Sequence, residues 1–259
     1  MSAIAFFNRH RRILGALMMR ELTTRFGREG LGFMWLVGEP LIFCFGVMAL
    51  WTLTKPEYEH GIRVAPFVMT GYMSLLLIRH HINMSVGALQ ANIGLLYHRQ
   101  IKSLHIFLAR NGLEFLGTTT AFVVVYVALL AVGEVQLPSD WLLLYAGWAL
   151  LGWMSMGLGL IMSGLAMRYD LADRLVSVIS YAMIPISGAF FMVAWLPAGI
   201  RDAYMLIPFP HAIEMVRASV FGEFVETHYD PVYALAVGTV MNLLGLLLVT
   251  GAEDKIDVD

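Results

Sequence analysis

WLLLYAGWALLGWMSMGLGLIMSGLAM, residues 141–167, contains no Asp, Glu, Lys or Arg in 27 positions. Two further stretches, Leu175 to Ile200 and Pro231 to Ala252, also lack these residues, over 26 and 22 positions. About 20 apolar residues in a helix cross the roughly 30 Å hydrocarbon core of a bilayer. The whole chain is 59% hydrophobic and only 14% charged, whereas soluble domains are about 25% charged. The sequence therefore predicts a protein embedded in a membrane.

Three other stretches are candidate spans, although two of them contain charge. Residues 115–133 are uncharged, residues 33–54 contain Glu39, and residues 64–84 contain Arg79. Together the six stretches predict an all-α polytopic membrane protein with six transmembrane helices. We expect one transmembrane domain at residues 31–252, after a cytoplasmic helix at 1–30 and before a short cytoplasmic tail at 253–259.

Basic residues predict the orientation of these spans. Of the 17 Lys and Arg residues, 12 precede the first span, follow the last, or lie between spans two and three or four and five. Cytoplasmic loops are the ones enriched in Lys and Arg. Both termini are therefore expected in the cytoplasm.

The segment from Asn8 to Gly30 predicts an amphipathic helix lying on the inner leaflet. Its apolar residues recur at helical spacing: Ile13, Leu14, Leu17, Met18 and Leu22. Glu21 and Arg25 interrupt this face, four residues apart in the order that favours a helical ion pair. Their presence suggests that this end contacts protein more than lipid. The alternative is a plain basic lead-in to the first span.

Residues 196–230 form a second unusual segment, on the outer side. Pro197, Pro208 and Pro210 break it, yet it stays rich in apolar residues. We expect short re-entrant helices between spans five and six, buried against protein. His211, Glu214 and Arg217 recur every three residues there. They either contact a polar substrate or pair with one another to fix the shape of the segment.

Charges inside the predicted spans need partners. Glu39 and Arg79 are both expected within about 10 Å of the inner edge of the bilayer, at 1.5 Å of rise per residue. An unpaired charge there is costly, so we expect a pair between Glu39 and Arg79, or contacts across a subunit interface. Arg110 and Glu114, four residues apart, form a second expected intramembrane pair.

Several motifs of enzymes are missing from the sequence. It has no GxxxxGK[ST] phosphate loop, and no HExxH, paired CxxC or GxSxG motif. We therefore expect no catalytic residue, no metal site and no ATP hydrolysis by this chain alone. His80 and His81 are adjacent, and neighbouring helical residues point about 100° apart, so they make a poor chelate. The small residues Ser155, Gly159 and Ser163 predict close helix packing rather than a substrate groove.

Three groups of residues resemble one family in the right order. The first is Arg20-Glu21-Leu22, Arg25-Phe26-Gly27-Arg28, Leu31-Gly32-Phe33-Met34-Trp35 and Glu39-Pro40. The second is Ala88-Leu89-Gln90-Ala91-Asn92, Leu95-Leu96-Tyr97, Ala109-Arg110 and Leu113-Glu114. The third is Ser187-Gly188, Phe190-Phe191, Leu196-Pro197 and Pro208-Phe209-Pro210-His211 with Glu214 and Arg217. Together they resemble permease subunits of bacterial capsular polysaccharide ABC exporters, of the KpsM type.

The resemblance implies a homodimer in the bacterial inner membrane, bound to two copies of a separate ATPase that holds ATP and magnesium. The cargo would be a lipid-linked polysaccharide, passed on to periplasmic and outer-membrane export components; no nucleic acid is involved. Residues 92–103 would form the coupling helix that contacts the ATPase. The implied coupling residues are Arg20, Glu21, Arg25, Asn92, Leu95, Leu96, Tyr97, His98 and Arg99. His98-Arg99 departs from the family pattern, in which a proline typically follows the tyrosine.

A sugar polymer needs a wet path with aromatic faces along which it can slide. The candidates for such a path are Trp35, Phe43, Tyr72, Tyr181, Phe190, Phe191 and Tyr204. We expect fewer than half of them to line it, because most aromatic residues face lipid or neighbouring helices. Export of O-antigen, teichoic acid, another lipid or a drug is an alternative within ABC exporters. A proton-coupled transporter or intramembrane enzyme that uses Glu39, Arg79 and His80 is the alternative from another class.

Overall fold

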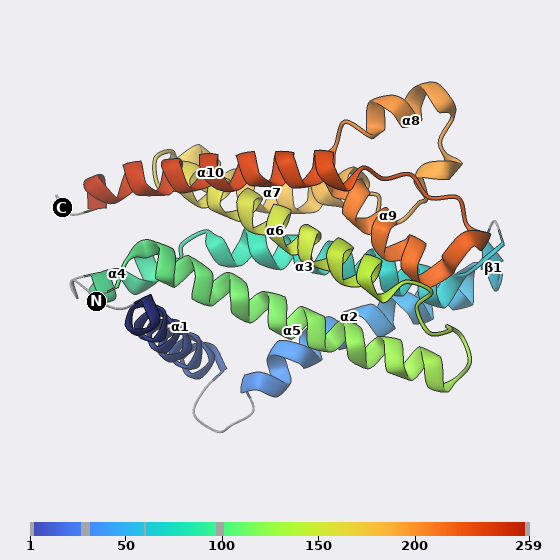
Figure 1. The fold of residues 1–259 in the computed structure, drawn as a ribbon, viewed down its shortest axis with the longest axis horizontal. Coiled ribbons are helices and arrows are strands. Elements are labelled where there is room, and N and C mark those ends of the chain that lie inside the picture. Colours follow the sequence, from blue (N-terminus) through green and yellow to red (C-terminus); the bar gives the residue numbers. More distant parts are fainter. Residues whose placement is uncertain (1–2, 27–31, 60, 97–100, 257–259) are drawn as a thin grey trace.

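The computed structural model describes residues 3–26, 32–59, 61–96 and 101–256 (Figure 1). In this part of the chain nearly every element is helical, and the strands β1 (Tyr58–Glu59) and β2 (Ile62–Arg63) form a single antiparallel hairpin. The predicted all-α class is confirmed. The helices are α1 (Ala3–Phe26), α2 (Gly32–Thr54), α3 (Val64–Ser85), α4 (Ile93–Leu96), α5 (Ser103–Ala131), α6 (Trp141–Ala166), α7 (Asp170–Ile186), α8 (Ala198–Tyr204), α9 (Pro208–Phe221) and α10 (Pro231–Ile256), with short 3-10 turns at Gln90–Asn92, Val193–Trp195 and Gly222–Phe224.

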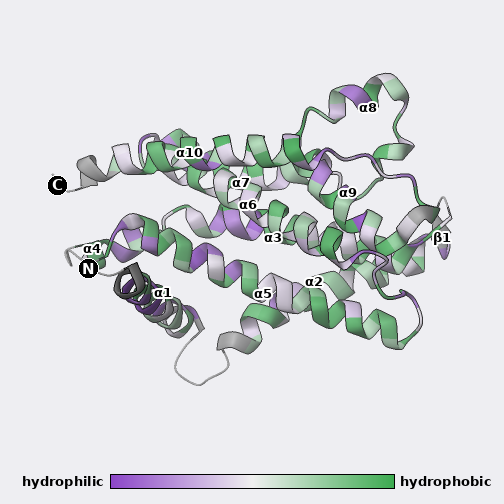
Figure 2. Cartoon of the chain, in the orientation of Figure 1, coloured by the Kyte–Doolittle hydropathy of each residue, from purple (hydrophilic) through white to green (hydrophobic). Residues whose placement is uncertain are grey.

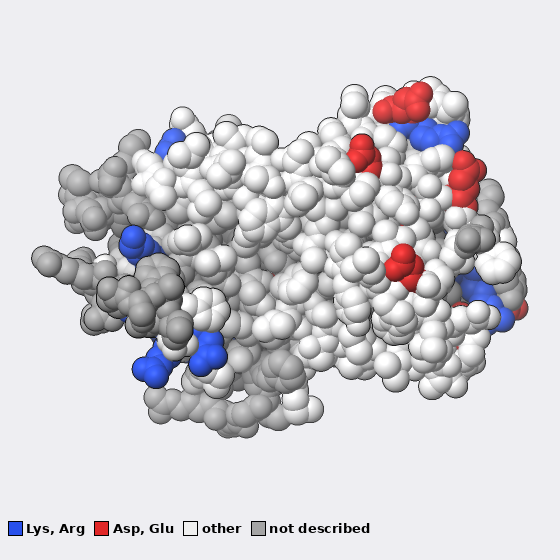
Figure 3. Space-filling view, in the orientation of Figure 1, with Lys and Arg blue, Asp and Glu red and all other residues white. Residues whose placement is uncertain are grey.

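The long helices run along one common direction. In Figure 1, α3, α5, α6 and α10 extend along the long axis, and α1, α4 and the end of α10 lie at one end. The hairpin β1–β2 lies at the opposite end. Hydrophobic residues dominate the long helices (Figure 2), and in Figure 3 the visible charged residues lie toward the two ends with an uncharged band between them. This distribution is the one that a bilayer requires.

Among the residues that the structure describes, four helices are long and apolar enough to cross a membrane, by length and composition. They cover Met34–Thr54 of α2, Ser103–Ala131 of α5, Trp141–Ala166 of α6 and Pro231–Ala252 of α10. The other two predicted spans correspond to α3 and α7. Arg79, His80 and His81 lower the hydropathy of α3, and α7 has only 17 residues.

Two predicted boundaries are wrong. The fifth span was expected to reach Ile200, but α7 ends at Ile186, and Gly188 follows with a φ of +79°. A φ in the left-handed region terminates a helix and is most easily adopted by glycine. The third span was predicted from the uncharged residues 115–133, but α5 begins at Ser103. The helix can include Arg110 and Glu114 because both side chains pair with charges of α1.

The core is centred on α6, which packs against α3, α9 and α10. Gly159 shows how closely the helices approach: a Cβ atom there would lie 2.6 Å from the carbonyl oxygen of His81 in α3. Ser155 and Ser163, on the same row, are buried. The row of small residues is therefore a packing surface between helices.

Candidate functional site

An ion network joins α1 to α3 and α5. Arg25, at the end of α1, pairs with Glu114 of α5 and at 2.7 Å with Glu21, one turn earlier in α1. Glu21 also lies 2.7 Å from Arg110 of α5, and Glu114 lies 3.4 Å from Nδ1 of His80 of α3. Acidic and basic side chains alternate in the network, so each carboxylate lies between two basic residues.

The expected ion pair between Arg110 and Glu114 is therefore wrong, because each residue pairs with a side chain of α1 instead. Both side chains lie on one face of α5, but α1 packs there and presents Glu21 and Arg25 in the opposite order. Each α5 charge consequently pairs across the helix interface. The face of α1 that carries Leu17 and Glu21 is the buried one, so this end of α1 contacts protein, as the sequence suggested.

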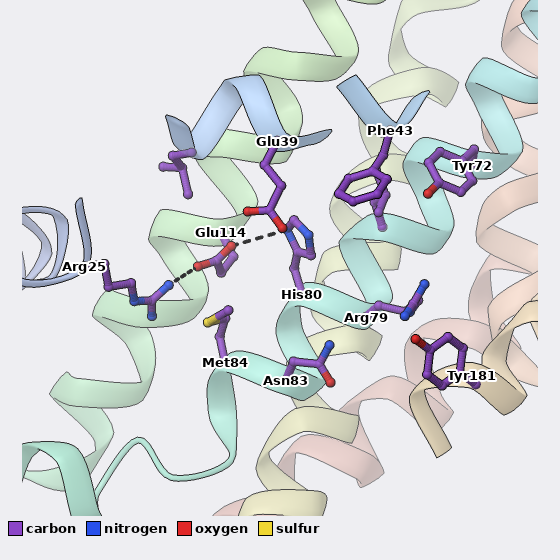
Figure 4. Close-up of a pocket in the computed structure, with 12 residues that line it drawn as sticks. Arg25, Glu39, Phe43, Tyr72, Arg79, His80, Asn83, Met84, Glu114 and Tyr181 are labelled. Atoms are coloured by element: carbon purple, nitrogen blue, oxygen red, sulfur yellow. Dashed lines mark hydrogen bonds and ion pairs between the residues drawn. The ribbon is translucent and has the colours of Figure 1, made fainter. Parts of the chain in front are cut away.

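Next to the network lies a cavity of about 380 Å³ (Figure 4). Its polar lining includes Glu39, Arg79, His80, Asn83 and Glu114. Figure 4 shows the Glu39 side chain directed toward His80 and Glu114, whereas the Arg79 guanidinium points toward Tyr181. The side chains come from five helices, so the cavity exists only in the folded chain.

The pair expected between Glu39 and Arg79 does not form within this chain. The other expectation, contacts across a subunit interface, stays a prediction. Nε of Arg79 donates to Oγ of Ser180 at 3.2 Å, and its guanidinium carbon lies 4.6 Å from the centre of the Tyr181 ring. Among the described residues, Glu39 and Arg79 form no ion pair with each other, although both line the cavity. The partners Ser180 and Tyr181 come from α7, about 100 residues further along the chain, so no spacing rule in the sequence points to them.

His80 and His81 turn to different partners. His80 faces Glu114, while Nδ1 of the buried His81 lies 2.8 Å from the carbonyl oxygen of Leu77. A shared ligand between the two rings is excluded by these directions. In the described part of the chain, no group of three His, Cys, Asp or Glu side chains is arranged to hold a metal ion.

The segment between α3 and α5 is fixed to α1 and to the core. Nη1 of Arg20 donates to Oδ1 of Asn92, and Nδ2 of Asn92 donates to the carbonyl oxygen of Ala88 at 2.9 Å. Ala88 and Leu89 are buried in a separate apolar cluster, while Ile93 is 42% exposed. Leu95 and Leu96 are half-buried, and the expected coupling residues Tyr97, His98 and Arg99 lie outside the described residues.

A histidine pair gives a second link between α1 and α5. Nδ1 of His10 lies 2.7 Å from Nε2 of His105, and the rings stack at 4.9 Å. The backbone N–H of Lys102 donates to Nδ1 of His105 at 3.0 Å. Because Nδ1 is an acceptor, the neutral His105 ring carries its proton on Nε2 and donates it to His10. Sequence reasoning missed this pair, because its members are 95 residues apart.

Arg217 organises the opposite end of the molecule. It is fully buried in α9 and donates to three backbone carbonyl oxygens, of Gly188 at 2.9 Å and of Ala189 and Phe191 at 2.7 Å each. Its Nη1 also lies 3.3 Å from Oε1 of Glu214, one turn earlier. The arginine therefore satisfies the backbone of the loop that follows α7.

His211 and Tyr204 form further hydrogen bonds to the backbone around the loop that follows α7. His211 accepts from the backbone N–H of Asp230 at Nδ1 (2.7 Å) and donates from Nε2 to Met205 (2.8 Å). The Tyr204 hydroxyl donates to the carbonyl oxygen of Ile186 at 2.7 Å, and burial raises the pKa of this phenol, so it stays a donor. Of the pairing expected from sequence, the structure contains the contact between Glu214 and Arg217. His211 bonds the backbone of Met205 and Asp230 instead, and a contact of these residues with substrate stays a prediction.

Comparison with known proteins identifies the chain's relatives. Residues 12–221 match the family described as ABC-2 type transporter. The chain belongs to the ABC-2 type transporter family. It is 35% identical to the capsule polysaccharide export inner-membrane protein CtrC of Neisseria meningitidis serogroup B over 240 residues, which cover 93% of this chain and 91% of CtrC.

Two further relatives are of similar length. The chain is 33% identical to the capsule polysaccharide export inner-membrane protein BexB of Haemophilus influenzae over 92% of the chain and 90% of BexB. It is 28% identical to the polysialic acid transport protein KpsM of Escherichia coli over 92% of the chain and 93% of KpsM. This ABC-2 transporter chain therefore aligns with its relatives almost end to end, as the resemblance read from its motifs implied.

The aromatic candidates of this ABC-2 transporter chain divide into three sets. Phe43, Tyr72 and Tyr181 line the cavity beside Arg79. Phe190 lies 6.3 Å from Tyr72 and 5.4 Å from Trp51, and Phe191 lies 5.2 Å from Tyr204, in the region organised by Arg217. Trp35 is 55% exposed and does not line the cavity. Trp51 was not among the candidates from sequence; through Phe190 it extends this aromatic set toward the C-terminal end of α2.

Proposed function

We propose that this chain is the permease subunit of an ATP-driven exporter of lipid-linked capsular polysaccharide in the bacterial inner membrane. The observation that carries the proposal is its alignment with capsule polysaccharide export proteins over more than 90% of its length, together with the match to the ABC-2 type transporter family. The sequence lacks a phosphate-binding loop, so the energy must come from another polypeptide.

The proposed topology has six crossings with both termini in the cytoplasm. Four crossings are α2, α5, α6 and α10, and we assign the other two to α3 and to α7 with the loop that follows it. In this arrangement α8 and α9 form the re-entrant region on the outer side. Support for the orientation comes from the 12 of 17 Lys and Arg residues assigned to the terminal side.

The proposed contact with the ATPase is formed by α1 and residues 92–103. Arg20 holds Asn92, and Ile93 is exposed beside it, so the segment has an anchored side and a free side. Tyr97, His98 and Arg99 complete the contact in this proposal. Two permeases and two ATPases would form the transporter, with ATP and magnesium bound by the ATPases. Closure of the ATPases would then rock the permeases as rigid bodies.

The proposed path for the sugar runs from the cavity toward the outer end, and periplasmic and outer-membrane components would receive the polymer. Phe43, Tyr72 and Tyr181 would begin this path, and Phe190 with Trp51 would continue it. Aromatic faces suit a sliding polymer, because they offer contact without fixing the cargo at one position.

The test is to copurify the chain with candidate ABC ATPases from the same organism and to measure transport in inverted vesicles. The proposal expects a stable complex, and uptake of capsular polysaccharide that requires ATP hydrolysis. An ATPase variant with an inactive phosphate-binding loop is the matched control. Uptake that persists without any ATPase, driven by a proton gradient, would overturn the proposal.

O-antigen, teichoic acid, other lipids and drugs remain alternative cargoes within the same mechanism, and the same vesicles can be offered each of them. A proton-coupled transporter or intramembrane enzyme using Glu39, Arg79 and His80 is the alternative class. Its central residues do not form one acid–base unit here, because Arg79 faces Ser180 and Tyr181 while His80 faces Glu114.

A further inference from the structure

Arg79 is a membrane-depth cation without a carboxylate partner among the described residues. It lies six residues before the end of α3, which is about 9 Å along the helix axis. Its Nε atom donates to Ser180, and its guanidinium stacks on Tyr181. Both Nη groups lack hydrogen-bond partners in the described part of the chain. A charge at such a depth is costly when unpaired and therefore indicates a functional site.

The two carboxylates on the same cavity do not supply the missing partner. Glu114 is already paired with Arg25 and His80. Glu39 is directed toward His80 and away from Arg79 (Figure 4). The cavity therefore has an acidic end that contains its own bases and a basic end that has no acid.

We propose that the Arg79 end of the cavity binds an oxyanion carried by the exported molecule, either a phosphate at its lipid end or the carboxylates of its sugars. This inference rests on the proposed export function and specifies the chemistry of the substrate. Two Nη groups in one plane match two oxygens of a phosphate or carboxylate. Stacking on Tyr181 and the bond to Ser180 fix that plane.

The surroundings of Arg79 suit such a group. Asn83 and Tyr72 also line the cavity and carry polar hydrogens. The volume of about 380 Å³ falls within the usual range for small-molecule sites, roughly 300–1,000 Å³. Glu39 at the other end repels a second anion and so confines the bound group to the Arg79 side.

The experiment uses the purified permease–ATPase complex in phosphatidylcholine nanodiscs and two anionic probes. Phosphatidylglycerol tests the phosphate source, and oligosialic acid tests the carboxylate source; a neutral dextran oligomer is the uncharged comparison. Native mass spectrometry measures the amount of each probe retained. The variants are Arg79→Gln, Arg79→Lys and, as the matched control, Arg174→Gln, which removes an exposed arginine of α7.

We expect Arg79→Gln to retain at least one anionic probe about tenfold less than the native chain, as loss of a charge-assisted bidentate contact predicts. Arg79→Lys should retain an intermediate amount, and Arg174→Gln the native amount. A loss confined to phosphatidylglycerol assigns the lipid phosphate, and a loss confined to oligosialic acid assigns the sugar carboxylates. Native retention of both probes by Arg79→Gln overturns the inference.

Copurification of each variant with the ATPase shows that it has folded and assembled, and Arg79→Lys preserves the charge if the glutamine variant does not assemble.

The outcome of this experiment can be distinguished from the outcome of the test of the proposed function. A native complex that transports with ATP but whose Arg79→Gln variant binds both probes normally refutes only the oxyanion site. A native complex that loses a probe upon Arg79→Gln but never transports polysaccharide refutes only the export function.

Discussion

Arg25 reaches from the end of α1 to Glu114 in α5, whose side chain is only 3% exposed. The same carboxylate also faces His80 of α3. One buried acid therefore connects α1, which is proposed to contact the ATPase, with both α5 and α3. Any movement of α1 must either carry α5 and α3 with it or break this buried pair.

Replacing Glu114 by Gln should detach α1 from α5. The change leaves Arg25 and His80 without their shared carboxylate, and breaking a buried ion pair lowers the free energy of unfolding by about 3 kcal/mol. The measurement is the apparent melting temperature of the purified chain in detergent. Arg12→Gln, on the exposed side of α1, is the control and should melt as the native chain does.

A double-mutant cycle of Arg25→Gln and Glu114→Gln isolates the pair itself. Because both changes remove the same contact, the double variant should be more stable than the sum of the single effects by about 1 kcal/mol or more. Strictly additive effects would show that the two residues do not interact in the protein.

Arg217→Lys should disrupt the loop between α7 and α8 despite keeping the charge. The guanidinium bonds three carbonyl oxygens in the loop after α7 and stacks 4.6 Å from the Phe67 ring. A lysine ammonium cannot reach all three in one plane. We expect a loss of about 3 kcal/mol and faster protease cleavage between residues 187 and 197. Arg201→Lys in α8, where one quarter of the side chain is exposed, should leave cleavage unchanged.

The ends of α6 and α10 could be predicted from sequence to within a few residues. Both begin at sharp signals: the Asp140 side chain accepts from the N–H of Leu143 and caps α6, and Pro231 opens α10. Charge is absent along most of both helices, so hydropathy alone gives their extent. The end of α7 could not be predicted in this way, because the residues after Ile186 are also uncharged. The helix ends where Gly188 adopts a left-handed backbone conformation.

The partners of the buried charged side chains could not be predicted from the sequence, for a different reason. Spacing along one helix shows which residues share a face, and it placed Glu21 with Arg25 correctly in one pair. It does not show which helix will cover that face. Arg110 therefore pairs with α1 rather than with its own neighbour Glu114, and Arg79 finds Ser180, 101 residues away.

Gly71→Ala should be among the most damaging single-methyl additions in the chain. A Cβ atom at this position of α3 would lie 1.8 Å from the backbone carbonyl oxygen of Ala189, which itself bonds Arg217. The loop after α7 would have to move away from α3, and the hydrogen bond between Arg217 and Ala189 would break. We expect a drop in apparent melting temperature and faster cleavage of the same loop as in Arg217→Lys.

Gly15→Ala is the matched control for this substitution, because a Cβ atom at this position of α1 meets nothing within 4 Å. In an exposed helix the change from glycine to alanine stabilises by about 1 kcal/mol. The two variants should therefore shift the melting temperature in opposite directions. A Gly71→Ala chain as stable as the native one would show that α3 and the loop after α7 do not meet as described.

The last prediction concerns the contact between Arg20 and Asn92, which orients the segment proposed to meet the ATPase. Arg20→Ala should weaken binding of the ATPase about fivefold, because the loss of one hydrogen bond to a charged group is worth roughly 1 kcal/mol or more. Titration of the purified ATPase against the permease in nanodiscs measures the change. Arg12→Ala, an exposed arginine of the same helix, tests whether positive charge alone is responsible. Asn92→Ala should remove most of the effect of Arg20→Ala when the two are combined, since the arginine then has no acceptor to lose. Independent, additive losses would instead mean that Arg20 contacts the ATPase directly and does not act by orienting Asn92.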